Sequence, residues 1–125
     1  MLIQSQNDVA AYGSNFPNCD TLPGDLVIGS GMFINDLSAF NGVQVILGDL
    51  KLQDVLGGPI DFSGFSQLTY IGGDLIVDHT VPLRNFQGLD LLQRVEGTVN
   101  IHDCDSLLDL TGLGSLSVVG GDQLL

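Results

Sequence analysis

The stretch Gly73-Asp74-Leu75-Ile76-Val77 decides the fold, because close versions of it return along the whole chain. Its first glycine has counterparts at Gly24, Gly48, Gly97 and Gly121, so that the spacings are 24, 25, 24 and 24 residues. A period of this length is typical of proteins built from stacked repeats, none of which is stable alone. The sequence therefore predicts a solenoid.

Each repeat carries three apolar groups at fixed distances from its glycine. The second and fourth positions after the glycine are apolar, and this alternation places their side chains on one face of a strand. Further along, the apolar spacing becomes three, interrupted by a glycine or alanine, which favours short bends or 3₁₀ turns over a regular helix. We expect all three groups to share one core: Leu26, Ile28, Leu37, Phe40, Val43, Ile46, Leu50, Leu52, Phe62, Phe65, Leu68, Ile71, Leu75, Val77, Phe86, Leu89, Leu92, Val95, Val99, Ile101, Leu110, Leu113, Leu116 and Val119.

The predicted fold is mainly β: a short right-handed parallel β-solenoid with one parallel sheet and an N-terminal capping helix. We expect residues 1–23 to form the cap and residues 24–125 to form about four and a half coils. Ser5 with Asp8 approximates a capping box and predicts a helix over roughly residues 6–12. The chain stops at Leu125, within a fifth coil, which would leave a strand edge and an apolar layer uncovered.

The charge balance restricts the partners of the chain. The sequence has 15 acidic and 3 basic residues, for a net charge of −12 at pH 7. Nucleic acids and anionic lipids are bound mainly through Lys and Arg, so the chain should repel both. It has no run of 18 apolar residues, and we expect neither a nucleic-acid partner nor insertion into a membrane.

The segment QSQNDVAAYG, residues 4–13, and repeats such as Gly73–Val77 and Leu110–Leu113 resemble a bacterial family of leucine-rich, receptor L-domain-like repeats. The resemblance extends from about residue 3 to residue 125. It implies an L-domain-like leucine-rich repeat fold and an extracellular or cell-surface location, although no signal peptide is visible in the chain. It also implies a role in adhesion or recognition, without shared catalytic residues.

The outward strand positions form the predicted binding face. In order along the chain they are Asp25, Val27, Asp49, Lys51, Asp74, Ile76, Thr98 and Asn100. Stacked carboxylates about 5 Å apart repel one another unless they are solvated or bridged by a cation. Our leading hypothesis is an extracellular, non-enzymatic module that binds a glycan or a protein through this face.

Two alternatives remain open at this point. The first is a self-assembling structural protein, or a fragment of a larger surface protein, that associates through its open last coil at Gly121 to Leu125. The second is a metal-binding, hydrolase-like site in the turns after the strands. In these turns, residues at the same offset from the repeat glycine form columns: one column holds Asp54, His79 and Asp103, and the next holds Asp78 and His102. Imidazole and carboxylate groups together suit a divalent transition metal. A divalent metal is the one cofactor that the sequence suggests, and ordinary polar turns explain the same residues.

Overall fold

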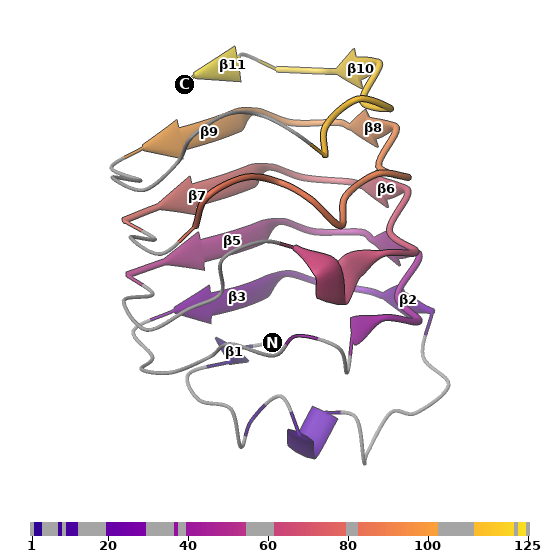
Figure 1. Cartoon of the computed structure of the whole chain (residues 1–125), viewed down its shortest axis with the longest axis vertical. Helices are drawn as coiled ribbons and strands as arrows, with labels where there is room; N and C mark the ends of the chain where they lie inside the picture. The colour runs from indigo at the N-terminus through magenta and orange to yellow at the C-terminus, as the bar shows by residue number, and fades with distance from the viewer. Residues whose placement is uncertain are drawn as a thin grey trace.

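The computed structural model describes residues 2–3, 8, 10–12, 20–29, 37, 40–54, 62–79, 83–102, 112–121 and 123–124. Within these residues the protein is mainly β, and its strands form two parallel sheets. Figure 1 shows the strands of each sheet stacked along the long axis, with the two termini toward opposite ends. In the same residues we find no helix whose length and apolar character would let it cross a bilayer.

The first sheet has six strands in the order β1-β3-β5-β7-β9-β11. The strands are β1 (Leu2–Ile3), β3 (Leu26–Gly29), β5 (Leu50–Gln53), β7 (Leu75–Asp78), β9 (Val99–His102) and β11 (Gln123–Leu124). Leu50 lies opposite Leu75, and Leu75 lies opposite Val99, so each glycine-headed stretch sits in register with the next. This confirms the parallel strands predicted from the repeat.

A second parallel sheet has five strands in the order β10-β8-β6-β4-β2, and the prediction of a single sheet was wrong. Its strands are β2 (Thr21–Leu22), β4 (Val45–Ile46), β6 (Tyr70–Ile71), β8 (Arg94–Val95) and β10 (Val118–Val119). They contain the last apolar residue of each repeat. Two residues are too few to show the period-two alternation by which a strand is recognised in a sequence.

Tight turns connect the two sheets on the side where the apolar spacing is three. The Phe65 amide donates to the Phe62 carbonyl at 2.9 Å, and the Leu68 amide donates to the Phe65 carbonyl at 3.0 Å. The short 3₁₀ helix η2 (Ser63–Phe65) lies here, and the same bonds link Phe86 to Leu89 and Leu89 to Leu92. Bonds between residues three apart confirm the predicted 3₁₀-like turns.

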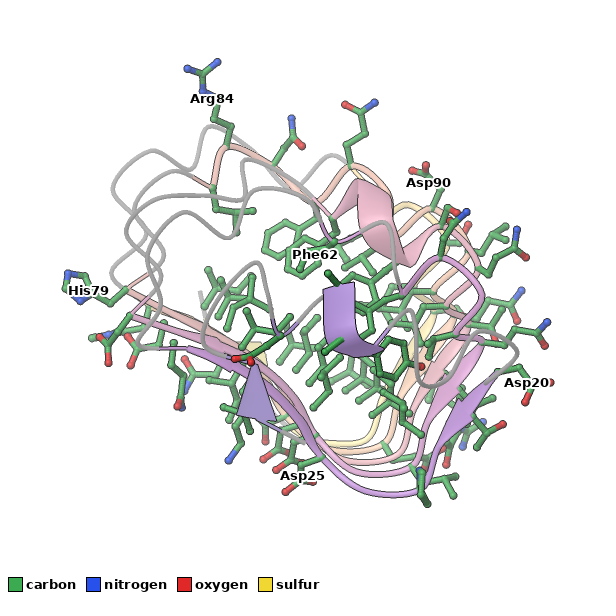
Figure 2. All side chains as sticks on the ribbon, turned by 90° about the horizontal axis from the view of Figure 1, so that it is seen from below. Asp20, Asp25, Phe62, His79, Arg84 and Asp90 are labelled. Atoms are coloured by element: carbon green, nitrogen blue, oxygen red, sulfur yellow. The ribbon has the colours of Figure 1, made fainter. Side chains whose placement is uncertain are left out.

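The core lies between the sheets and these turns. The predicted core residues from Leu26 to Ile101 are all buried, as Phe62 illustrates in Figure 2, where it points inward. Their aromatic rings stack between repeats, with centroids 5.5 Å apart for Phe40 and Phe65 and 5.4 Å apart for Phe62 and Phe86. In the last repeat the prediction is only partly met: Leu113, Leu116 and Val119 are partly buried, and Leu110 lies outside the described residues.

At the N-terminus, Asp8 and residues 10–12 have helical backbone geometry. Tyr12 is buried, with its ring centroid 4.6 Å from that of Phe40. The rest of the predicted helix over residues 6–12, including its cap at Ser5, lies outside the described residues, so the helix as a whole stays a prediction. β1 adds a strand beside β3 that the repeat pattern did not predict.

Candidate functional site

The predicted binding face lies on the outer side of the first sheet. Val27, Lys51, Ile76 and Asn100 occupy one column, because β3, β5, β7 and β9 pair in register there. All four side chains are half-buried, between fully buried neighbours that point inward. The alternation predicted for the strands is therefore present, with the outward positions on one regular surface.

The neighbouring column of carboxylates forms a hydrogen-bonded ladder. Asp25 Oδ1 accepts from the Asp49 amide at 2.8 Å, Asp49 Oδ1 from the Asp74 amide at 2.7 Å, and Asp74 Oδ1 from the Thr98 amide at 2.8 Å. Lys51 Nζ lies 3.6 Å from Asp49 Oδ2, the second oxygen of that carboxylate. The sequence predicted repulsion within this column, relieved only by water or a cation. Backbone amides and Lys51 contribute to that relief.

The recurring glycine makes room for this ladder. A Cβ at Gly73 would lie 2.0 Å from Asp49 Oδ1, and one at Gly97 would lie 2.0 Å from Asp74 Oδ1. At Gly24, which begins the series, a Cβ would meet nothing within 4 Å. The glycine of one repeat therefore accommodates the aspartate of the repeat before it. This explains why Gly and Asp occur together in the motif.

The second candidate group lies where the strands of the first sheet end. Asp54 Oδ1 is 3.0 Å from His79 Nδ1, and Asp78 Oδ1 is 3.2 Å from His102 Nδ1. The structure thus brings four of the predicted metal ligands together as two pairs, whereas Asp103 lies outside the described residues. His79 and His102 are half or more exposed at the side chain, so solvent screens both pairs and their contribution to stability is small.

The backbone at this edge is unusual. Asp54 has φ of 54° and His79 has φ of 49°, and both are in the left-handed region that residues other than glycine seldom adopt. They occupy the same place in successive repeats, since the amides of both donate to the next row, to the carbonyls of Asp78 and His102. The turn geometry therefore repeats even though the side chain changes from Asp to His.

No metal centre is formed by these groups in the part of the chain that the structure describes. Nowhere among those residues do three or more His, Cys, Asp or Glu side chains gather closely enough to hold an ion. A pair of ligands provides fewer than the four that a structural zinc site requires. The described arrangement is a pair of side-chain bridges between rows.

A third surface was missed by the sequence reasoning, which considered only the glycine-headed strands and the turns after them. It is the outer side of the second sheet, where the column Val45, Tyr70, Arg94 is in register across β4, β6 and β8. Beside it runs a second column, Gln44, Thr69 and Gln93, linked by backbone bonds from one row to the next. The glycine register could have revealed both columns, since these residues share the same offsets from Gly48, Gly73 and Gly97.

Comparison with protein-family models, curated proteins and solved structures finds no match to this chain.

Proposed function

We propose that the chain is a right-handed parallel β-solenoid of the receptor L-domain-like kind, with about four and a half coils and an N-terminal helix as its cap. In chain order, the strands from β2 to β11 alternate between the two sheets, which supports a continuous winding. The close approach of Gly48, Gly73 and Gly97 to the aspartate one repeat earlier supports the same winding.

The function we propose is non-enzymatic recognition of a glycan or a protein at the bacterial cell surface, through the outer face of the first sheet. The observation that carries this proposal is the register of Val27, Lys51, Ile76 and Asn100 in one column beside the aspartate ladder. Such a column places side chains at regular intervals along the sheet, which suits an extended ligand. The resemblance noted above supports the surface location.

A charge reversal on this face tests the proposal. Lys51→Glu should abolish ligand binding, because Lys51 is the basic side chain of this face and the ligand would meet one more carboxylate beside Asp49. Arg84→Glu is the matched control, with the same change of charge at an exposed side chain that points away from the sheet face in Figure 2. Binding is measured on a glycan array and in pull-downs with surface proteins. The proposal would be contradicted if the wild-type chain gave no hits in either assay, or if Lys51→Glu and Arg84→Glu lost ligand binding to the same extent.

Self-assembly through the last repeat is a second candidate, supported by a specific observation. Leu113, Leu116 and Val119 are partly exposed, whereas their counterparts one repeat earlier, Leu89, Leu92 and Val95, are fully buried. Among the described strands, β10 and β11 are the last of their sheets. Such edges pair readily with a second chain, and a two-fold contact would close the assembly.

The test compares two neighbouring valines of β10. Val119 packs against the core in the last layer, and Val118 faces outward with 38% exposure. We expect the wild-type chain to sediment as a dimer at high micromolar concentration, Val119→Asp as a monomer, and Val118→Asp as a dimer. Thermal melting of both variants controls for unfolding. A wild-type monomer at the same concentration would refute self-assembly.

A further inference from the structure

Tyr70 stands apart from the other aromatic side chains that the structure describes. Tyr12, Phe40, Phe62, Phe65 and Phe86 are buried in the core, whereas Tyr70 is half-buried on the outer side of β6. Its neighbour two residues on is Gly72, which has no side chain to cover the ring on that side. An aromatic ring held at the surface of a sheet offers a rigid apolar contact at little conformational cost.

Planar polar groups lie near Tyr70 in the neighbouring rows, in or next to the strands β4 and β8. Gln44 and Gln93 are exposed, one strand away on either side. Arg94, next to Gln93, forms an ion pair with Glu96. The Gln amides can both donate to and accept from hydroxyl groups, whereas the Arg94 guanidinium only donates and the Glu96 carboxylate only accepts.

The charge of this surface differs from that of the first sheet. On the outer side of the second sheet and its edge, the described charged residues are Asp20, Asp90, Arg94 and Glu96, three acids and one base. The first sheet and its edge carry five acids and one base: Asp25, Asp49, Asp54, Asp74, Asp78 and Lys51. A chain with a net charge of −12 disfavours anionic ligands, and Arg94 is already paired. A neutral ligand is the kind that this surface fits.

The spacing of the rows fits an extended ligand. Neighbouring strands of a sheet are about 4.8 Å apart, so Gln44 and Gln93 are separated by about 10 Å with the row of Tyr70 between them. The distance between neighbouring rows is comparable to the length that one pyranose ring adds to an extended polysaccharide. The column of Gln44, Thr69 and Gln93 runs along the stack of strands. It begins at Asp20, whose carbonyl accepts from the Gln44 amide and which Figure 2 labels on this side of the molecule.

We propose that the outer side of the second sheet binds a neutral glycan, with one sugar ring stacked on Tyr70 and its hydroxyl groups bonded to Gln44, Gln93 and the Arg94–Glu96 pair. The apolar face of a pyranose contacts the ring, and the side chains of Val45 and Leu47 extend the apolar border, Leu47 with 52% exposure. This site does not depend on the surface proposed for recognition above, because the two lie on different sheets.

The probes are the neutral oligosaccharides cellohexaose, xylohexaose and mannohexaose, with polygalacturonate as an anionic comparator. Binding is measured by calorimetry and by intrinsic fluorescence, which reports on tyrosine because the chain has two Tyr and no Trp. We expect at least one neutral probe to bind and to change the fluorescence. Tyr70→Ala should weaken that binding by about tenfold or more, the scale of one lost stacking contact, and Tyr70→Phe should stay close to the wild-type affinity.

Arg84→Glu changes the charge at an exposed side chain outside the strands of both sheets, so it is the control variant and should bind like the wild type. The inference is overturned if no neutral probe binds, if Tyr70→Ala binds as well as the wild type, or if polygalacturonate binds equally well. Loss of binding in Lys51→Glu but not in Tyr70→Ala would place the ligand on the first sheet. That result would overturn this inference and leave the proposed function standing.

Discussion

Replacing Gly73 with alanine should lower the free energy of unfolding by about 3 kcal/mol or more, while the same change at Gly24 should have almost no effect. Both glycines begin a repeat, and neither has a positive φ. They differ in what lies beside them. The new Cβ would lie 2.0 Å from Asp49 Oδ1 at Gly73 and would meet nothing within 4 Å at Gly24.

The size of the effect follows from the two ways in which the clash can be relieved. Asp49 can swing away, but its Oδ1 then no longer accepts from the Asp74 amide, and losing such a bond costs about 1–3 kcal/mol. The Cβ still lies 2.9 Å from the Gly48 carbonyl carbon, so the backbone must also shift. Forcing extra volume into a packed site typically costs about 1–3 kcal/mol more.

Urea unfolding of Gly73→Ala, Gly24→Ala, Asp49→Ala and the Asp49→Ala/Gly73→Ala double variant measures the coupling. Because Asp49→Ala removes the oxygen that clashes, Gly73→Ala should be less destabilising in that background than in the wild type. A double-mutant cycle isolates this difference. The aspartate does not occupy the space left by the glycine if the losses in unfolding free energy of Asp49→Ala and Gly73→Ala are additive. The same conclusion follows if Gly24→Ala is as destabilising as Gly73→Ala.

The glycine register predicted the strands of the first sheet because it fixes both the start and the face of each strand. Leu75 and Val77 had to point inward once Gly73 was aligned with Gly48 and Gly97, and both are buried. The role of Asp49 could not be predicted in the same way. A sequence shows that Asp recurs after Gly, but whether its carboxylate faces solvent, a cation or an amide depends on how the repeats stack.

The sequence could predict that Asp54 and His79 lie in the same column, but not that their side chains are in contact. Counting offsets placed the two residues in successive rows, and the structure brings Oδ1 and Nδ1 to 3.0 Å. Their left-handed backbone could not be predicted from residue type, because Asp and His adopt this conformation more often than most residues but still in only a small fraction of cases. The surface at Tyr70 was missed for another reason: its strands are two residues long and have no glycine before them to mark their start.

Replacing Phe65 with alanine should lower the free energy of unfolding by about 3–5 kcal/mol, whereas leucine at the same position should cost only about 1–2 kcal/mol. Phe65 is fully buried, and its ring is stacked on Phe40 with an interplanar angle of 6°. Alanine would remove the ring and leave a cavity between repeats. Leucine would lose the stacking, which contributes about 0.5–1.5 kcal/mol, but would keep most of the volume.

The repeat itself supports the leucine control. The position of Phe65 is occupied by Phe40 one repeat earlier and by Leu89 one repeat later, and all three are fully buried. The column therefore already accommodates leucine next to phenylalanine, so Phe65→Leu should fold with the same core. Tyr70→Ala, which truncates an aromatic side chain outside the core, should lower the free energy of unfolding less than Phe65→Ala does.

Urea unfolding compares the three variants: if the dependence of the free energy on urea concentration is unchanged, the shift of the midpoint reports the change in stability. Equal losses for Phe65→Leu and Phe65→Ala would mean that the ring stack, and not the filling of the layer between repeats, holds this part of the core together.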